Sequence, residues 1–400
     1  MKPASAHRIL GAVFSTSLGV GLIFGFEPPL IAMVLNRSGH STVLIGAVIA
    51  VSLVAVSLIG PLYPIAIARL GLQRSVMSGI GVAVLILFVM PFWNSVPAWI
   101  LLRVATGCAL GLSWIASEIW MNTVSGEKSR GAVMGIYGTV FSIGTVAGPV
   151  LLEFTGTSGA APFLIGGLCL GLTLLPLALL PDVARSSASH AAQSAEAARL
   201  ASSATWRSTL RKLFGFLPAA PVVMLAAAVA GLVESADLSL LPLFGLHAGL
   251  DERTALLLVT VFLAGNVALQ LPIGLLADRF GRRLMLGVCA AASALGPLLL
   301  PGVLDRPPLL WPLLFVWGGT LYAFYSQGIA LLGEEFPERD LAGANTVFVM
   351  VYCVGGILGP SIGGTAMDLW PHRGLPALLS IAAASLLTLL SLGRRARAIA

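Results

Sequence analysis

Apolar stretches of about twenty residues recur along the whole chain, and they constrain its fold more than any other feature of the sequence. A stretch of that length crosses a hydrocarbon core of about 30 Å as an α-helix, which rises about 1.5 Å per residue. The strands of a membrane barrel are shorter and alternate in polarity. Only 10% of the 400 residues are charged, against about a quarter in soluble domains. The sequence therefore predicts an all-α membrane protein.

The apolar stretches predict twelve transmembrane helices in two six-helix bundles. The polar stretch from Asp182 to Pro218 is rich in Ala, Ser and Arg and has too few apolar residues for a core, so it is expected to be a linker. The first bundle is then expected at residues 1–181, a cytoplasmic linker at 182–218 and the second bundle at 219–400. The spans are expected at residues 9–35, 42–67, 75–95, 98–122, 129–152, 160–180, 219–246, 253–277, 283–303, 309–333, 341–366 and 374–392.

The cations predict the orientation of these spans. With the N-terminus in the cytoplasm, the outer loops hold only four cations, which are Arg37, Arg253, Arg306 and Arg373. Arg103 lies within a span, and the remaining cations fall on the inner side, as the positive-inside rule requires. Both termini are therefore expected in the cytoplasm. The net charge of +6 then reflects topology and contact with anionic membrane lipids rather than nucleic acid.

The two halves of the sequence match each other. At an offset of 210 residues Glu27 meets Asp237, and at an offset of 211 residues Pro149 meets Pro360. A near-constant offset over so long a stretch indicates a duplicated six-helix unit. Two such units of the same orientation can rock about a central cavity, which is the geometry of alternating access.

Ionisable side chains inside the spans are few, and each costs about 2.5–3.5 kcal/mol on insertion scales unless it finds a partner or water. Glu27 in the first span and Arg103 in the fourth lie at similar depths, so they are expected to meet. The pair is either a structural salt bridge or a proton switch. Pro28 and Pro29 favour the switch, because a proline kink leaves backbone carbonyls free for solute or water.

Glu234 and Asp237 are three residues apart on the seventh span and so share one helix face. Two carboxylates this close in a low dielectric do not both ionise easily. The pair is a candidate site for proton coupling or cation binding; the alternative is that one of the two only lines hydrated protein near the outer mouth. Polar side chains elsewhere in the spans suit hydrogen bonding and stacking with a small organic solute, and are expected to line its cavity: Asn266, Gln270, Tyr322, Tyr325, Ser326, Gln327 and Asn345.

The stretch GLLADRFGRR from Gly274 to Arg283 resembles the signature loop of the major facilitator superfamily. RVATG, beginning at Arg103, resembles the fourth-helix motif of that family, in which the arginine is tied to coupling in proton-linked members. The run from Glu118 to Tyr137 is similar to a bacterial subgroup whose substrates are largely unassigned. The resemblance implies two six-helix bundles around one substrate site, secondary transport by rocker-switch alternating access, and a place in the bacterial inner membrane.

The resemblance also implies a cytoplasmic gate. In it Gly274 lets helices approach, and Asp278 accepts from backbone amides at the start of the fifth span, near Ser129. Ala68 stands where the first half would carry the matching acid, so the gate is expected to be asymmetric. The alternative for Arg282 and Arg283 is that they only set topology. The other gate residues are expected to be Arg279, Gly281, Arg69, Arg74, Glu118, Glu334 and Glu335.

No nucleotide-binding loop, metal cluster or nucleophile triad is found in the sequence, so we expect no enzyme and no cofactor beyond a proton gradient. Three functions stay open. Proton-coupled export by antiport is favoured because carboxylates outnumber cations in the spans, although Leu151 and Leu152 replace the glycine pair of a drug:proton antiporter motif. The others are uptake of a small polar metabolite by proton symport, and a sensor or assembly factor that moves nothing. The expected partners are a small solute, protons and lipids, with the chain acting as a monomer.

Overall fold

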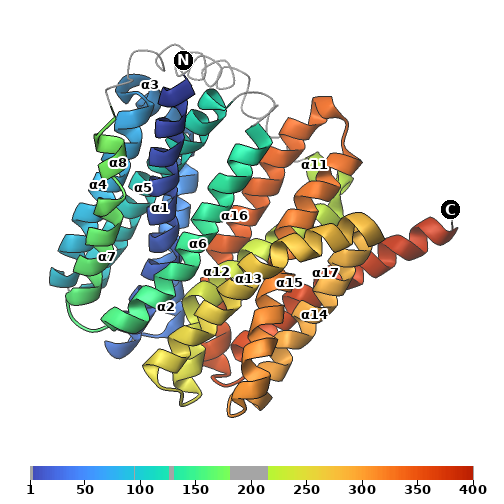
Figure 1. The fold of residues 1–400 in the computed structure, drawn as a ribbon. Coiled ribbons are helices and arrows are strands. Elements are labelled where there is room, and N and C mark those ends of the chain that lie inside the picture. The colour runs from blue at the N-terminus through green and yellow to red at the C-terminus, as the bar shows by residue number, and fades with distance from the viewer. Residues whose placement is uncertain (1–2, 94, 126–129, 181–214, 400) are drawn as a thin grey trace. The chain divides into compact units, whose positions relative to one another are not determined.

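The computed structural model describes residues 3–93, 95–125, 130–180 and 215–399. Every regular element in these ranges is a helix, and twelve are long and apolar enough to cross a membrane, which confirms the twelve predicted spans. Figure 1 shows them coloured along the chain. The α-helices are α1 (Pro3–Arg37), α2 (Thr42–Ile59), α3 (Tyr63–Leu70), α4 (Leu72–Val89), α5 (Val96–Val124), α6 (Arg130–Thr155), α7 (Ala161–Leu172), α8 (Leu175–Ala178), α11 (Phe216–Ala219), α12 (Pro221–His247), α13 (Glu252–Phe280), α14 (Arg282–Val303), α15 (Pro307–Glu335), α16 (Glu338–Leu369) and α17 (Gly374–Ile399).

The second span differs from its predicted bounds of 42–67. Helix α2 ends at Ile59, and a 3₁₀ turn at Gly60–Leu62 leads into the separate helix α3. Pro61 lies in this turn, and its missing backbone N–H removes a hydrogen bond that would continue the preceding helix. Apolarity alone does not show this break, since the residues on both sides of it are apolar.

The chain groups into two compact units. The first unit is Met1–Leu30 with Val51–Thr205, and the second is Ile31–Ala50 with Trp206–Ala400. Helices α1 and α2 therefore each contribute to both units. Most of the linker expected at residues 182–218 lies outside the described residues, and its last residues lead into α11.

The first unit brings α1 and α6 together backbone to backbone. A Cβ atom on Gly21 of α1 would lie 2.1 Å from the carbonyl oxygen of Phe141, and one on Gly144 of α6 would lie 2.2 Å from that of Leu18. Any side chain larger than hydrogen would push the helices apart. Elsewhere in this unit α4 packs against α5 and α7.

The second unit repeats this contact between α12 and α16. A Cβ atom on Gly231 would lie 2.0 Å from the carbonyl oxygen of Tyr352, and one on Gly355 would lie 2.1 Å from that of Ala228. These four residues follow their counterparts in the first unit by 210 or 211 positions. The sequence repeat is therefore also a repeat of helix packing. Helices α13 and α15 pack against each other in the same unit, and α14 packs against α15 and α17.

Substitution of Gly265 tests the α13–α15 contact. A Cβ atom there would lie 1.9 Å from the backbone carbonyl of Phe315, so Gly265→Ala is expected to lower stability by about 1–3 kcal/mol through overpacking. Gly287→Ala in α14 is the matched control, because its Cβ atom would meet no atom within 4 Å. Thermal unfolding in detergent measures both variants. Equal melting temperatures would contradict the close contact.

Candidate functional site

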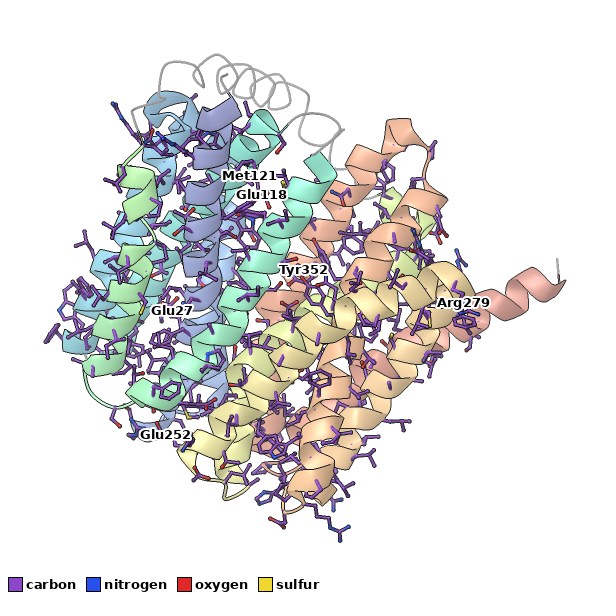
Figure 2. All side chains as sticks on the ribbon, viewed as in Figure 1. Glu27, Glu118, Met121, Glu252, Arg279 and Tyr352 are labelled. Atoms are coloured by element: carbon purple, nitrogen blue, oxygen red, sulfur yellow. The ribbon has the colours of Figure 1, made fainter. Side chains whose placement is uncertain are left out.

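A buried ion pair joins α1 and α5 in the first unit. Nη1 of Arg103 lies 2.5 Å from Oε2 of Glu27, and their side chains are only 5% and 4% exposed. Nη2 of Arg103 also donates to Oγ of Ser52 in α2 at 2.6 Å. The contact predicted between Glu27 and Arg103 is confirmed, and Glu27 is labelled on α1 in Figure 2. Ser52 was not predicted, because its only signal is a hydroxyl in a mostly apolar run.

Pro28 and Pro29 follow Glu27 inside α1, and the helix continues through both. Each proline removes the N–H that would bond to a carbonyl four residues earlier, so the carbonyls of Phe24 and Gly25 lose their helical donors. Oε1 of Glu27 is itself buried without a hydrogen-bond partner among the described residues. Unused acceptors therefore collect at this level of α1.

The second unit places a different acidic group at the equivalent level of α12. The hydroxyl of Tyr352 in α16 donates to Oε2 of Glu234 at 2.8 Å. Asp237, one turn further along α12, is fully buried, and neither of its oxygens has a hydrogen-bond partner among the described residues. Glu234 and Asp237 are electrostatic neighbours, as their spacing predicts.

The repeat explains why Asp237 lacks a cation although Glu27 has one. Applying the offsets of 211 and 210 residues to Arg103 and Ser52 leads to Leu314 and Phe262. Both are apolar and buried in the second unit. Both units thus carry an acid at this position, but within the described ranges such partners are found for Glu27 and not for Asp237.

Three tyrosines gather beside Glu234. The ring of Tyr325 in α15 lies 5.0 Å from that of Tyr352, centroid to centroid, at 67°, and 6.4 Å from that of Tyr322. Phe348 of α16 adds a fourth ring, 5.3 Å from Tyr325. Tyr322 and Tyr325 were predicted cavity residues, and the structure brings them together. Tyr352, labelled in Figure 2, was missed, although three of only five tyrosines in the chain lie in this cluster.

The remaining polar candidates divide by burial. Asn266 and Gln327 are buried, and the side-chain oxygen of Asn266 has no hydrogen-bond partner among the described residues. Gln270 and Asn345 are exposed, and Ser326 bonds to the carbonyl of Ala323 at 3.5 Å on its own helix. Their part in a substrate cavity stays a prediction.

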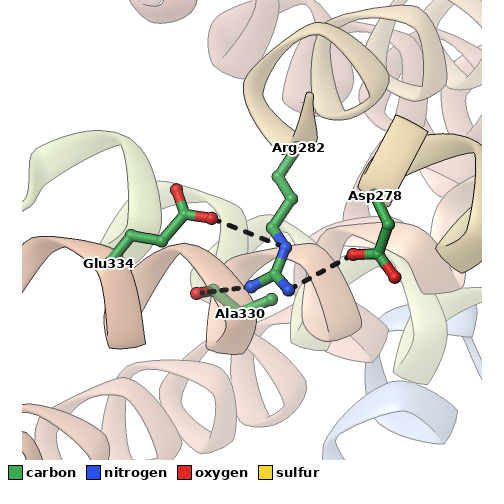
Figure 3. A network of polar contacts seen from close by, with 4 residues as sticks. All are labelled: Asp278, Arg282, Ala330 and Glu334. Carbon is green, nitrogen blue, oxygen red and sulfur yellow. Dashed lines mark hydrogen bonds and ion pairs between the residues drawn. The ribbon is translucent and has the colours of Figure 1, made fainter. Parts of the chain in front are cut away.

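The loop between α13 and α14 is held by Arg282. Gly281 ends α13 with φ of 96°, a conformation that favours glycine, and α14 begins directly after it. As Figure 3 shows, the Arg282 guanidinium reaches Asp278 at 3.3 Å, the carbonyl of Ala330 at 3.1 Å and Glu334 at 3.5 Å. One arginine thus ties the loop to the end of α15.

Arg283 pairs with Glu335 beside this network. The expected proximity of Glu334 and Glu335 to the two arginines is therefore confirmed. Arg279 is exposed, with its guanidinium carbon 5.4 Å from the centroid of the Phe280 ring. These contacts all lie within the second unit.

Two expectations for this loop have different outcomes. Asp278 was expected to accept from amides near Ser129, which lies outside the described residues, so that contact stays a prediction; Asp278 pairs with Arg282. Gly274 was expected to let helices approach, yet a Cβ atom there would meet no described atom within 4 Å. Gly265, nine residues earlier on α13, makes the close contact instead.

The matching loop of the first unit has a similar glycine turn but lacks the acid that Asp278 provides in the second unit. Gly71 has φ of 81° and separates α3 from α4, as Gly281 separates α13 from α14. Arg69 and Arg74 are exposed on these helices. Glu118 accepts from the indole of Trp114 at 2.7 Å, one turn earlier on α5. The pairing of Glu118 with Arg69 or Arg74 stays a prediction.

A carboxylate contact at the start of α2 was not predicted. Asp368, near the end of α16, accepts from the backbone amides of Thr42 at 3.1 Å and Val43 at 3.2 Å. The Thr42 hydroxyl contacts the same carboxylate and lies 2.8 Å from the carbonyl of Gly364. Asp368 therefore caps α2 from another helix, and its negative charge faces the positive end of the α2 dipole. The only sequence signal is an acid directly before the polar end of a span.

The sequence matches one protein-family model and is similar to several bacterial proteins. The family model described as the Major Facilitator Superfamily matches residues 9–259 and 223–399. The chain is 25% identical over 375 residues to a Bacillus subtilis (strain 168) protein named "Uncharacterized MFS-type transporter YfkF", covering 94% of this chain and 92% of that one. It is 26% identical over 307 residues to "Uncharacterized MFS-type transporter YcaD" of Escherichia coli (strain K12 / DH10B), covering 76% and 73%.

Solved structures show the same fold. A D323A mutant of the nucleoside transporter NupG matches with a TM-score of 0.76 at 16% identity, covering 98% of this chain and 99% of that one. A D-xylose-proton symporter matches with a TM-score of 0.72 at 17% identity, covering 94% and 97%. At these identities the likeness concerns the fold alone.

Proposed function

The chain belongs to the major facilitator superfamily, and from this premise we propose that it moves a small organic solute across the membrane by alternating access coupled to protons. Transport itself follows from the family and its transporter relatives, and so does the absence of an enzymatic role. Twelve apolar helices make it a multi-pass membrane protein. Proton coupling, direction and compartment are the parts that we propose.

The environment of Asp237 is the observation that supports this proposal most strongly. It lies in the middle of a membrane-spanning helix, is fully buried, and has no hydrogen-bond donor among the described residues. An ionised carboxylate in such a place costs several kcal/mol, whereas the protonated acid or a carboxylate beside a bound cation costs much less. A group with these properties suits a transporter that binds and releases a proton in each cycle.

The Glu27–Arg103 pair supports the same proposal in the first unit. Both charges are satisfied in the conformation described, with Ser52 as a further partner of the arginine. A conformational change that separated them would leave two desolvated charges, so a proton on Glu27 would stabilise the separated state. The pair then acts as a switch; if it stays intact throughout the cycle, it is structural.

Alternating access also needs polar contacts that form in one state and break in another. Asp368 is exposed, so water can replace the α2 amides around it when that contact opens. The Arg282 network is likewise exposed, with Asp278 at 65% and Glu334 at 57%. Such contacts are worth little individually, which suits a gate that opens in every cycle.

We propose the compartment and the direction of transport mainly from the distribution of charge. The cations on the inner loops favour cytoplasmic termini, and the bacterial relatives favour the inner membrane of a bacterium. We place export by antiport ahead of uptake by symport because the carboxylates of Glu27, Glu234 and Asp237 outnumber the cations within the spans, where Arg103 is the one buried cation among the described residues. Membrane lipids surround the protein, and one chain carries both units, so a monomer suffices.

A thermal-shift screen on the purified full-length protein tests the function, because a bound solute raises the melting temperature by mass action. Compounds that stabilise it are then loaded into proteoliposomes, and their movement is followed under an imposed pH gradient. Movement that reverses with the sign of the gradient supports proton coupling, and its sign separates antiport from symport. A stabilising compound that never crosses the membrane would point to a sensor instead.

Asp278→Asn tests the gate loop. We expect transport to slow a few-fold while binding of the screened compound stays nearly unchanged, because the exposed contact with Arg282 is worth no more than about 1 kcal/mol. Initial transport rates and binding isotherms measure the two effects. Asp305→Asn, another exposed aspartate of the second unit, is the control. A large loss of affinity in Asp278→Asn would place this residue at the substrate site rather than the gate.

A further inference from the structure

The second unit combines aromatic rings with uncompensated acids. Tyr322, Tyr325 and Tyr352 form one cluster on α15 and α16, and the hydroxyl of Tyr352 bonds to Glu234 at 2.8 Å. Glu234 is an electrostatic neighbour of Tyr322 as well as of Tyr352. Aromatic faces attract cations through the ring quadrupole, most strongly when water is excluded.

In the part of the chain that the structure describes, no positive side chain balances this cluster. Within the described residues neither Glu234 nor Asp237 forms an ion pair with Lys, Arg or His. Asp237 is fully buried with both oxygens unpartnered, and that is the polar group a bound cation would satisfy. A neutral solute could stack on the rings, but it would leave the acids uncompensated.

The acidic and aromatic side chains of this cluster differ in their exposure to solvent. Glu234 and the three tyrosines are partly exposed, whereas Asp237 is fully buried. The rings and Glu234 are therefore more accessible to a solute than Asp237 is. No group of three or more His, Cys, Asp or Glu side chains in the described ranges is arranged to hold a metal ion. This favours an organic cation over a metal cation.

We propose that Glu234 and the cluster of Tyr322, Tyr325 and Tyr352 bind a small organic cation of the alkylammonium class beside Asp237. The inference rests on the proposed transport function and names its substrate class. The rings surround the ammonium group, Glu234 provides the counter-charge, and Asp237 holds the proton. A cation beside Asp237 disfavours a proton-transfer step that adds further positive charge, so cation and proton exclude each other, as antiport requires.

The test compares a cation with its neutral isostere on the wild-type protein. Choline and 3,3-dimethylbutan-1-ol differ in that nitrogen replaces carbon, so they have nearly the same shape but only choline carries a positive charge. We expect choline, tetraethylammonium or benzyltrimethylammonium to raise the melting temperature of the full-length protein in detergent, and the alcohol to leave it unchanged. Titration calorimetry then gives the affinities. This comparison needs no variant to fold.

Variants locate the site. Glu234→Gln is expected to weaken binding of the stabilising ammonium ion at least about tenfold, and Tyr325→Leu several-fold, because the first removes the counter-charge and the second a ring. Tyr352→Phe keeps its ring and should lose less than Tyr352→Leu. The matched controls lie in the first unit: Glu153→Gln removes a partly exposed carboxylate, and Tyr137→Phe removes a buried hydroxyl. Both should bind as wild type does.

Each outcome bears on one of the two proposals. Equal stabilisation by choline and the alcohol, no stabilisation by any of the three ammonium ions, or unchanged affinity in Glu234→Gln would overturn the cation site. Movement of a neutral solute under a pH gradient would also overturn it while leaving proton-coupled transport intact. A cation that binds through Glu234 but is never moved would instead overturn the transport proposal and leave the site.

Discussion

Replacing Asp237 by Asn is expected to abolish solute movement driven by a pH gradient, while exchange of labelled solute across the same membrane should continue. Asn has nearly the shape of Asp but can neither release nor accept the proton. If Asp237 carries the coupling proton, the variant still binds solute and still alternates between its two states, so only the link to the gradient is lost. We expect gradient-driven accumulation to be lost, with exchange within a few-fold of wild type, because a side chain that neither releases nor accepts a proton leaves no link to the gradient.

The measurement uses proteoliposomes loaded with a compound that stabilises the purified protein. Accumulation is followed after an acid or alkaline jump, and exchange is followed at equal pH on both sides. The control is Asp305→Asn, which makes the same chemical change at an exposed position outside the spans. If Asp237→Asn accumulates solute as wild type does, Asp237 has no part in coupling, and the Glu27–Arg103 pair becomes the main candidate.

The stability of this variant provides a second readout. Because Asp237 has no hydrogen-bond donor among the described residues, replacing it by a neutral amide removes no observed contact. We therefore expect its melting temperature to stay close to that of wild type, within the range of conservative substitutions. A collapse in stability would mean that the loss of transport reflects unfolding.

The spans could be predicted from the sequence because a helix that crosses a membrane requires a long apolar run. Every segment in lipid must satisfy its own backbone, so a long apolar run leaves a helix as the solution. What it did not show were breaks within apolar runs, such as the end of α2 before Pro61, where local backbone chemistry outweighs hydropathy. The predicted linker could not be compared, because most of it lies outside the described residues.

The candidate site was predicted in part: its charged residues were found from the sequence, but some of their partners were not. Glu27, Arg103, Glu234 and Asp237 were found because charge inside a span is costly and rare. Tyr352 was missed because a tyrosine in a span has many ordinary roles, and only its hydrogen bond to Glu234 gives it a particular one.

Contacts between side chains on distant helices could not be predicted from any single span. The Asp368 cap on α2 joins residues 326 positions apart, and nothing within either span indicates it. The missing cation beside Asp237 was, in contrast, readable in the sequence: the repeat offset leads from Arg103 to Leu314. The repeat therefore carries more information about the site than any single motif does.

The second large effect, a loss of stability, is expected at Arg103, where the two units differ. Replacing Arg103 by Leu gives the first unit the residue that the second unit carries and leaves Glu27 buried without its cation. Breaking a buried pair on one side costs about 3–5 kcal/mol, because the remaining charge loses its compensation. We expect a correspondingly large fall in stability, measured by thermal or detergent-induced unfolding. Glu27→Gln should also destabilise, since Arg103 then keeps Ser52 but loses the carboxylate.

The double variant Glu27→Gln/Arg103→Leu separates the two roles left open for the pair. Removing both charges together should recover most of the stability lost in either single variant, because no unpaired ion remains; purely additive losses would mean that the two side chains do not compensate each other. A stable double variant that still accumulates solute under a pH gradient makes the pair a structural salt bridge. A stable double variant that exchanges solute but no longer responds to the gradient makes it a proton switch, and the first unit then takes part in coupling alongside Asp237.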